Sequence, residues 1–577
     1  MTVKIVLQDA FKKFTDDQDK VLPPEETVRR LRERLATLDL KILDHTRRID
    51  SGRLGIPVYF SRCGADAEAI TGTKKQMGKG ATPAQAEASA VMELAERFSF
   101  FSFCNTPGNF IVDTWANLKD RAIPFEMIAR SVHDESADLA VTRQVFETLP
   151  MRWTWAYNLT RERAVLVPFD WFFAINEFNG PSAGNCTEEA ISQGICEVVE
   201  RHVSALVSHG RISVPAIDPA TATDPAVREM IAKYEVAGVK LFLSDFTLAT
   251  GIPTVGAMGW DPSTFPEKSE IVWTAGTTPS PEKALSRALT EVAQLAGDFN
   301  TGASFVASGL PKYRSMEEAR YVTDPEKTVS LQALPDLSDN NIRVEIENMV
   351  RVLAAADMEV LLIDTMHPGL RVPAFYTIIP GAHFRERAIG TSVGMFAAKL
   401  IAENHPPQAA MAQLSAMAAR LPGKYYLQFY LGLCHSRDQN PEAALSHFGR
   451  ALDLEPPATD AASICSYMGA CLKDQERYDE ALEVLEKGLA ADAERTDILN
   501  LMGFCHFKQK AHEAAIDCFR KILALDPSSA IDYANIASNY RDMGNREKAI
   551  DYYEMALALD PTIEFAADNL TRLQQGS

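Results

Sequence analysis

The sequence lacks several features that mark specialised classes of protein. Its nine cysteines form no CxxC pair, so neither a zinc site nor a disulfide framework is expected. No apolar run approaches the roughly 18 residues of a membrane-spanning helix. The opening MTVKIVLQDAFKKF has no signal-peptide core or cleavage site. Positive charge is in deficit, with a formal net charge of −20, which disfavours general binding to nucleic acid backbones. We therefore expect a cytoplasmic protein whose main partner is neither membrane nor nucleic acid.

Three segments carry polar residues at one shared spacing, in which the second and third residues follow the first by four and seven positions. They are Ser89, Glu93 and Glu96; Gln193, Glu197 and Glu200; and Arg287, Glu291 and Gln294. On a helix these positions fall within an arc of roughly 60°. Each segment therefore predicts a narrow polar stripe on one side of a helix.

The residues around the first two stripes are apolar nearly all the way round, as in buried helices. Buried carboxylates cannot stay ionised without cations. Four glutamates on two such helices therefore predict a hard metal ion, and all-oxygen ligation suits Mg²⁺. The alternative is that one face of each helix reaches solvent.

Each stripe also follows a helix-start signal. Thr82 is the expected N-cap of the first helix, Thr187 of the second and Ser280 of the third. Before the first helix, TGTKKQMGKGAT has glycines and lysines but fails the Walker spacing, so it is not a P-loop. Lys79 is expected in a loop there, either reaching a phosphate or solvated.

Several segments have strand patterns, and helical segments alternate with them. The clearest are IPVYFSRCG, VKLFLSDFT, IPTVGAMGW, EIVWTAGTT, MEVLLIDTM and PAFYTIIPG. The stretch from Met151 to Asn179, which includes VLVPFDWFF, is expected to form strands followed by a loop. This alternation predicts an α+β domain over residues 1–404.

After a linker at residues 405–424, which begins His405-Pro406-Pro407, the strand patterns stop and a repeat of about 34 residues begins. Each repeat has one small residue in its first helix and another in its second helix. A large residue follows the small residue of the second helix by four positions. In that order the three sets are Gly432, Gly469, Gly503 and Ala537; Ala444, Ala481, Ala515 and Ala549; and Phe448, Leu485, Phe519 and Tyr553. This is the tetratricopeptide signature, and it predicts an all-α solenoid over residues 425–577. Peptide capture and assembly both remain open as its role.

The polar stripes lie in segments that resemble a known family. GKGATPAQAEASAVMELAERFSFF, NGPSAGNCTEEAISQGICEVVERH and PEKALSRALTEVAQ resemble, in order, the three signature segments of YcaO proteins. The resemblance covers roughly residues 25 to 400. It implies an enzyme that binds ATP with Mg²⁺ held by glutamates and phosphorylates a backbone amide oxygen of a peptide or protein. A side chain then attacks to give an azoline, or sulfide attacks to give a thioamide.

The resemblance also implies roles by position. The metal-holding residues would be Glu93, Glu96, Glu197 and Glu200, which together with Arg287 form the catalytic set. The nucleotide would contact Ser89, Asn185, Glu189, Gln193, Arg201, Arg287, Glu291 and Gln294, with Lys79 and Arg97 facing phosphates.

The chain departs from azoline-forming members at its end, TRLQQGS, where those members have a proline-rich tail. Its opening, PEETVRRLRERL through GRLGIPVYF, resembles the thioamide-associated branch, whose members work with a TfuA-type partner. We therefore expect thioamidation, aided by a TfuA-like or sulfur-delivery partner. Two alternatives stay open: cyclodehydration, and an adaptor whose ATP site is regulatory, such as an accessory factor for ribosomal-protein methylthiolation. The substrate, the nucleophile and a homodimer are left undetermined.

Overall fold

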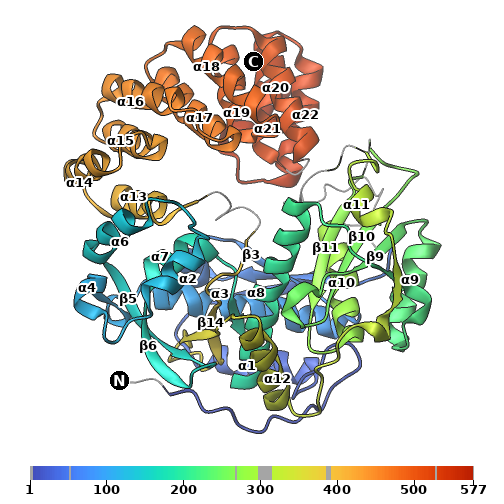
Figure 1. The fold of residues 1–577 in the computed structure, drawn as a ribbon. Helices are drawn as coiled ribbons and strands as arrows, with labels where there is room; N and C mark the ends of the chain where they lie inside the picture. Colours follow the sequence, from blue (N-terminus) through green and yellow to red (C-terminus); the bar gives the residue numbers. More distant parts are fainter. Residues whose placement is uncertain are drawn as a thin grey trace. The chain divides into compact units, whose positions relative to one another are not determined.

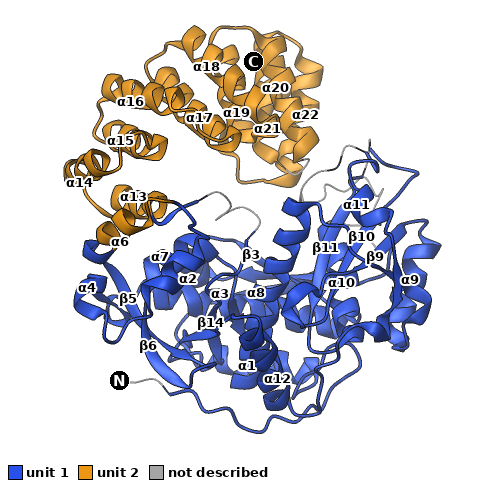
Figure 2. Cartoon of the chain, viewed as in Figure 1, with its two compact units in different colours: residues 1–136, 147–303, 308–393 blue, residues 137–146, 304–307, 394–577 orange. Residues whose placement is uncertain are grey.

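The computed structural model describes residues 4–50, 53–266, 269–296, 313, 315–384, 391–526 and 529–575. The chain forms two compact units (Figure 2). Unit 1 comprises residues 1–136, 147–303 and 308–393, and unit 2 comprises residues 137–146, 304–307 and 394–577. All nine cysteines are free thiols. No helix among the described residues is both long and apolar enough to cross a membrane.

A three-stranded antiparallel sheet opens unit 1, in the order β1-β2-β3. Its strands are β1 (Leu43–Arg48), β2 (Val58–Cys63) and β3 (Lys75–Lys79). Helix α3 (Pro83–Cys104) packs closely on it: a Cβ added at Gly78 would lie 2.1 Å from the backbone nitrogen of Ala90. Glycine is therefore required on β3, and this contact fixes the height of α3 over the sheet. Helix α1 (Pro24–Ala36) buries Val28 and Leu31 in the same core.

The other two sheets complete unit 1 (Figure 1). The six-stranded sheet has the order β4-β5-β13-β14-β7, with β6 beside β5, and the five-stranded sheet has the order β11-β10-β9-β8-β12. The strands of the first are β4 (Ile111–Asp113), β5 (Met151–Asn158), β6 (Arg163–Pro168), β7 (Pro181–Ala183), β13 (Leu361–Asp364) and β14 (Ala374–Ile378); those of the second are β8 (Ala216–Asp218), β9 (Lys240–Asp245), β10 (Thr254–Trp260), β11 (Val272–Thr277) and β12 (Thr328–Ser330). The expected strands in these segments are confirmed.

Helix α8 (Thr187–Gly210) connects the two larger sheets, since it contacts β7 and β14 of one and β10 and β11 of the other. A Cβ at Gly194 would lie 2.3 Å from Oγ1 of Thr377, so α8 passes close to β14 there. Helix α10 (Pro281–Ala296) covers β10 and β11. The three helices with polar stripes thus belong to one unit. The remaining helices of unit 1 are α2 (Ala65–Thr71), α4 (Trp115–Leu118), α5 (Phe125–Ser131), α7 (Phe169–Asn176), α9 (Pro225–Val236), α11 (Arg320–Thr323) and α12 (Ile342–Ala355).

Unit 2 is helical over its described residues, as the repeat predicts. Its helices are α6 (Leu139–Thr148), most of which lies in this unit, α13 (Val393–Asn404), α14 (Pro407–Arg420), α15 (Tyr425–Arg437), α16 (Pro441–Asp453), α17 (Ala458–Asp474), α18 (Tyr478–Ala491), α19 (Thr496–Lys508), α20 (His512–Leu525), α21 (Ala530–Asp542), α22 (Arg546–Leu559) and α23 (Glu564–Gln575). A Cβ at Gly432, Gly469 or Gly503 would meet the large residue of the paired helix, at 2.6, 2.4 and 2.6 Å. The predicted close crossing of first and second helices is confirmed.

Three local predictions are wrong. Phe169–Asn176 forms α7, whereas strands followed by a loop were expected; its aromatic residues pack on all sides, which hides the helical period. Lys79 ends strand β3 and pairs against β2, so it is not in a loop. The N-cap of α8 is Cys186, whose sulfur accepts from the Glu189 amide at 3.5 Å, and Thr187 is already helical. The predicted N-cap Thr82 is confirmed, since its hydroxyl accepts from the Gln85 amide at 3.2 Å.

Candidate active site

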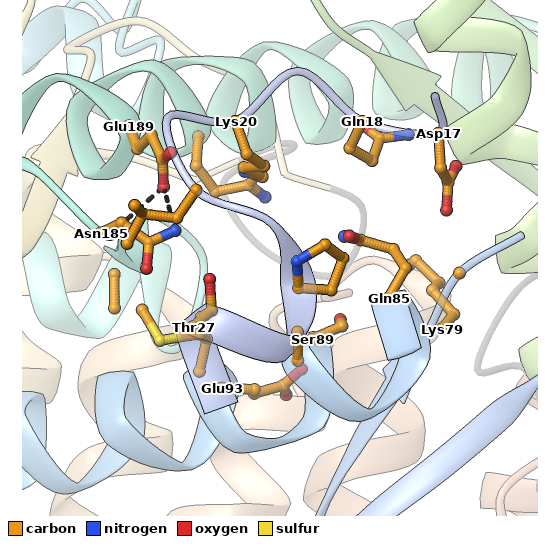
Figure 3. Close-up of a pocket in the computed structure, with 18 of the residues that line it drawn as sticks. Asp17, Gln18, Lys20, Thr27, Lys79, Gln85, Ser89, Glu93, Asn185 and Glu189 are labelled. Atoms are coloured by element: carbon orange, nitrogen blue, oxygen red, sulfur yellow. Dashed lines mark hydrogen bonds between the residues drawn. The ribbon is translucent and has the colours of Figure 1, made fainter. Parts of the chain in front are cut away.

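A pocket in unit 1 collects polar side chains from several parts of the chain (Figure 3). These are an N-terminal strap, defined here as residues 4–23, the start of α1, the end of β3, helix α3, the segment around the start of α8 with its middle, and α10. The lining residues are Asp17, Gln18, Lys20, Leu22, Pro24, Thr27, Lys79, Gly80, Gln85, Ala88, Ser89, Met92, Glu93, Glu96, Ala183, Gly184, Asn185, Glu189, Gln193, Arg287 and Thr290. The three predicted stripes therefore contribute to one pocket.

The stripe on α3 is held by an arginine of the same helix. The guanidinium of Arg97 lies 3.8 Å from the carboxylate of Glu93 and 3.5 Å from that of Glu96. It also donates to the carbonyl of Phe178 at 3.1 Å. Arg97 is mostly buried, so its charge acts on the two carboxylates with little screening by water.

The stripes on α8 and α10 are joined directly. Nε of Arg287 donates to Glu200 at 3.0 Å, and another guanidinium nitrogen donates to the side-chain oxygen of Gln193 at 3.0 Å. Glu200 is 2% exposed and also accepts from the backbone amide of Thr277 at 3.1 Å. A cation held between two helices in this way is fixed in position before any ligand arrives.

Glu197, one turn before Glu200, has weaker partners. Its carboxylate accepts from the backbone amide of Gly180 at 3.3 Å and lies 3.9 Å from the guanidinium of Arg201. Burial raises its pKa above the ordinary range of a glutamate. Burial also raises the pKa of Glu96, well above that range, and the charges of Glu197 and Glu93 add to the effect. The carboxylates of α3 and α8 are therefore close enough to repel one another.

Lys79 enters the pocket from the end of β3 and forms an ion pair with Glu291 on α10. Burial, followed by repulsion from Arg287, lowers the pKa of Lys79 to about 7. Two cations from different elements thus face the same space. An anion between them would relieve this repulsion.

This donor set fits Mg²⁺ bound with a polyphosphate. Among the described residues no three carboxylate, imidazole or thiol groups are placed to hold a metal ion unaided. However, burial raises the pKa of Glu96 and of Glu197 although arginines nearby lower it, so a further cation in the pocket would stabilise the charged forms of both carboxylates. Carboxylate oxygens are the ligands that Mg²⁺ prefers, and phosphate would supply others. The two buried cations, Lys79 and Arg287, suit the phosphates.

Glu189 lines the pocket on the side away from Lys79 (Figure 3) and accepts hydrogen bonds from the backbone there. One of its oxygens accepts from the backbone amide of Val21 at 2.6 Å, and the other accepts from the amide and side chain of Asn185 at 2.9 and 3.0 Å. Figure 3 shows the contacts with Asn185. In this structure Glu189 thus holds the strap and the start of α8 together.

The structure places the predicted site residues in four groups. Those that line the pocket are Lys79, Ser89, Glu93, Glu96, Asn185, Glu189, Gln193 and Arg287. Those that join the lining through ion pairs or hydrogen bonds are Arg97, Glu200 and Glu291, while Glu197 and Arg201 pair with each other. Gln294 lies on α10 but does not line the pocket.

The strap and the residues next to it are the main part of the pocket that the sequence reasoning missed. Asp17, Gln18, Lys20 and Thr27 all face it (Figure 3). Asp17 is 1% exposed; it accepts from the Ala81 amide at 2.6 Å and from the Ser286 hydroxyl at 2.9 Å. It thereby ties the strap to the turn after β3 and to α10. No periodicity marks this segment, so the sequence offered no signal for it.

Fold and site together define a class: an α+β unit with a pocket of paired carboxylates and cations, followed by a repeat of helix pairs. The family model described as YcaO cyclodehydratase, ATP- and Mg²⁺-binding, matches residues 77–383, more than half of the chain. The chain belongs to the YcaO family, whose enzymes use ATP and Mg²⁺ as cofactors. Residues 494–562 match the tetratricopeptide repeat model.

Two curated relatives match more than half of this chain. An uncharacterised protein of Methanothermobacter thermautotrophicus is 28% identical over 379 residues, which are 62% of this chain and 93% of the relative. A protein from the tfuA 3′ region of Rhizobium leguminosarum bv. trifolii is 24% identical over 401 residues, 64% of this chain and 89% of the relative. Among solved structures, a heterocyclase in complex with substrate and cofactor has the same fold with a TM-score of 0.53 at 23% identity, covering 66% of this chain and 55% of that one.

Proposed function

We propose that unit 1 uses Mg·ATP to phosphorylate the oxygen of a backbone amide in a peptide or protein, and that sulfide then converts the amide to a thioamide. The observation that carries the proposal is the meeting of the polar stripes of α3, α8 and α10 at one pocket, where buried carboxylates face buried cations. Phosphoryl transfer depends mainly on positioning and on neutralising charge, and such a pocket supplies both.

Each group of side chains has a distinct task in this proposal. Mg²⁺ would be held by Glu93, Glu96, Glu197 and Glu200, and when bound it neutralises phosphate charge. Lys79, Arg97 and Arg287 bind phosphate oxygens. Ser89, Asn185, Glu189 and Gln193 bind or orient the nucleotide from the pocket lining, with Glu189 acting through Asn185 and the strap. Glu291 acts through Lys79 and Arg201 through Glu197. Gln294 is assigned to the nucleotide by its position on α10 alone.

The chemistry balances with ATP and sulfide as the two co-reactants. The amide oxygen takes the γ-phosphoryl group and becomes a leaving group, and ADP is released. Sulfide forms a bond to the amide carbon, and the carbon–oxygen bond breaks to release phosphate. A thioamide branch with a TfuA-like partner is supported by the relative from the tfuA 3′ region.

Mass spectrometry of the host proteome, with and without this chain, tests the proposal. We expect at least one peptide whose mass rises by the difference between sulfur and oxygen, only when the chain and a sulfide source are both present. A chain with Glu197→Gln should leave that peptide unmodified. If no peptide changes in mass while ATP is consumed, the proposed reaction is wrong.

Cyclodehydration is the second candidate, and the family description as a cyclodehydratase favours it. Its product would lose one water per site, would need a neighbouring Cys, Ser or Thr in the substrate, and would form without sulfide. An adaptor role, with a regulatory ATP site, is the third. It predicts ATP binding without any change in the mass of a host peptide.

We propose further that residues 1–404 fold without the repeats, which recruit the protein substrate or a sulfur-delivery partner. A fragment ending at Asn404 should bind Mg·ATP as the full chain does, measured by calorimetry, but should lose turnover of the protein substrate. An insoluble fragment would show that this boundary is misplaced. A soluble fragment with full turnover would show that the repeats have another role.

A further inference from the structure

An exposed aromatic ring lies beside the carboxylates of α3. Phe178 is 48% exposed, and the guanidinium carbon of Arg97 lies 5.8 Å from the centroid of its ring. The same guanidinium donates to the carbonyl of Phe178 at 3.1 Å and lies 3.8 Å from Glu93 and 3.5 Å from Glu96. One guanidinium therefore separates this ring from two of the glutamates proposed to hold the metal.

A tight turn between α7 and β7 presents the ring. The amide of Asn179 donates to the carbonyl of Asn176 at 2.9 Å, which closes a four-residue turn around Glu177 and Phe178. Glu177 has φ 48° and ψ −113°, the dihedrals of the first central position of a type II′ turn, where glycine is usual. A glutamate is strained there, and strain of this kind is found where a turn serves a functional site.

The turn is tied to the glutamates of both helices. Arg97 of α3 binds the carbonyl of Phe178, and the amide of Gly180 donates to Glu197 of α8 at 3.3 Å. A Cβ at Gly180 would lie 2.3 Å from the carbonyl oxygen of Thr377, so this glycine is required for the chain to pass β14. The position of the ring relative to the carboxylates is therefore fixed by contacts on each side of it.

Two further rings extend the apolar surface. The ring centroids of Phe101 and Phe173 lie 5.7 and 6.3 Å from that of Phe178, and both residues are partly exposed. We call these three residues the aromatic shelf. The charge of Arg97 is already engaged by the two carboxylates of α3, so the shelf offers a ligand mainly apolar surface.

We propose that the aromatic shelf selects the substrate of unit 1 by binding a large apolar side chain close to the amide that is activated. An extended chain advances about 3.3 Å per residue, so a shelf one guanidinium away from the carboxylates serves a side chain within about three residues of that amide. Burying an apolar side chain against the rings is favourable, whereas a charged one would lose its water. This inference rests on the proposed function, because it takes the substrate to be a peptide or protein.

A designed peptide tests the shelf on the full chain. The probe is fluorescein-labelled GSFGSFGSFGS, in which phenylalanine recurs every third position, so that any register brings one ring close to the shelf. The comparison peptides are GSAGSAGSAGS and GSDGSDGSDGS. With Mg²⁺ and the ATP analogue AMPPCP present, fluorescence anisotropy should show saturable binding of the probe. Both comparison peptides should bind at least about ten-fold more weakly.

Three variants locate the binding site. Phe178→Ala should weaken probe binding by about ten-fold or more, as loss of a central aromatic contact does. Phe178→Leu should bind the probe more tightly than Phe178→Ala, because leucine keeps apolar surface at the shelf. Phe565→Ala is the matched control, because Phe565 is 41% exposed but lies on α23 of unit 2. It should bind the probe as the wild type does.

The modified host peptide gives a second readout. It should carry a large apolar side chain within about three residues of the modified amide. On this peptide Phe178→Ala should raise KM by about ten-fold or more and change kcat less, as loss of an interaction that is equal in ground and transition states does.

The outcomes separate this inference from the proposed function. Probe binding should persist in Glu197→Gln, because glutamine keeps an oxygen that accepts from the Gly180 amide. Probe binding that depends on Phe178, without a mass change in any host peptide, would support the shelf and contradict the proposed reaction alone.

Four results would overturn the inference. They are that no peptide binds, that the three peptides bind equally, that Phe565→Ala weakens probe binding as much as Phe178→Ala, or that Phe178→Ala weakens Mg·ATP binding in calorimetry and leaves probe binding intact. The last result would mean that the ring only shields Arg97. A dimer that Phe178→Ala abolishes, with no effect of the probe, would likewise overturn it, since a second copy would then cover the shelf.

Discussion

Helices α8 and α18 carry glutamates at similar spacing but place them in opposite environments. On α8, Glu200 is buried and the Glu197 side chain is 14% exposed, and burial raises the pKa of Glu197. On α18, Glu483 and Glu486 are exposed. At its first turn Glu480 is also exposed, and a hydrogen bond from Arg477 lowers its pKa. Glutamates at helical spacing are therefore held in an environment that disfavours their charge on α8, whereas those on α18 are solvated.

The two helices differ in how many of their sides are covered by neighbouring helices and strands. Helix α8 contacts both larger sheets and α12, and most of its residues are buried. Helix α18 contacts α17 and α19 and leaves its outer side to solvent. A carboxylate is costly only when water is excluded and no cation is present. The comparison teaches that a glutamate stripe predicts a metal site only on a helix that is apolar on its other sides.

The largest effect should come from removing one buried carboxylate. Glu197→Gln keeps the shape of the side chain and removes its charge, so ATP consumption should fall by at least ~100-fold, or ~2.7 kcal/mol of transition-state stabilisation. Calorimetry should also show that ATP binding to the wild type needs Mg²⁺ and is lost when a chelator removes it.

Glu483→Gln on α18 is the control for the same chemical change at an exposed position, and it should leave ATP consumption unaltered. Equal ATP binding by wild type and Glu197→Gln, with and without chelator, would contradict the metal-holding role of the carboxylates.

A pH effect should follow from the buried histidine of unit 1. Burial, with the charges of His383 and His133, lowers the pKa of His202 from 6.5 to about 4, and its Nδ1 accepts from the His383 amide at 2.9 Å. His202 is thus neutral in the folded chain. As pH falls below 6.5 the unfolded chain binds the proton first, so the free energy of unfolding should fall by on the order of 3 kcal/mol before levelling near pH 4.

Urea unfolding of wild type and His202→Gln at pH 7 and pH 5 measures this contribution as the difference between their pH dependences. His447 in the solenoid is the comparison, because burial lowers its pKa too but it is only partly buried. His447→Gln should change the pH dependence less. An identical pH dependence of wild type and His202→Gln would show that His202 is not held neutral.

The smallest effect should come from the solenoid crossings. A Cβ at Gly469 would lie 2.4 Å from the end of the Leu485 side chain, which can shift, so Gly469→Ala should cost about 1 kcal/mol of stability by overpacking. Gly449 on α16 has no atom within 4 Å of its added Cβ, so Gly449→Ala should be neutral or stabilise by up to ~1 kcal/mol. Thermal unfolding should show this opposite order, and equal effects would mean that Gly469 does not mark a close crossing.

The sequence was informative where a segment has one clear period and one environment. A stripe such as Ser89, Glu93 and Glu96, in which the later residues follow the first by four and seven positions, predicted both the helix and the direction of its polar side. The repeat of Gly432, Gly469 and Gly503 likewise identified the helix pairs, because each glycine must admit a large residue of the next helix. In both cases the spacing along the helix and the packing of the fold require the same kind of residue at the same positions.

Local pattern failed where tertiary contacts set the environment. The aromatic residues of α7 are buried on several sides, so no helical period separates a polar face. Lys79 is in a strand because β3 pairs with β2 and Gly78 lets α3 approach, although glycine and lysine by themselves favour a loop. The strap follows the surface of α8, α10 and α12 through hydrogen bonds to side chains such as Asn341, and such contacts leave no period in the sequence.

The sequence by itself determined which residues carry charge on which helices, and the order of α+β unit and solenoid. Only the tertiary structure decided which groups meet: the charges of Arg287 with Glu200 and of Lys79 with Glu291, and the Asp17 carboxylate with the Ala81 amide in the turn after β3. The physical reason is range. Helical period and turn chemistry act over a few residues, whereas ion pairs and hydrogen bonds in the pocket join segments up to about 270 positions apart and depend on how the sheets bring those segments together.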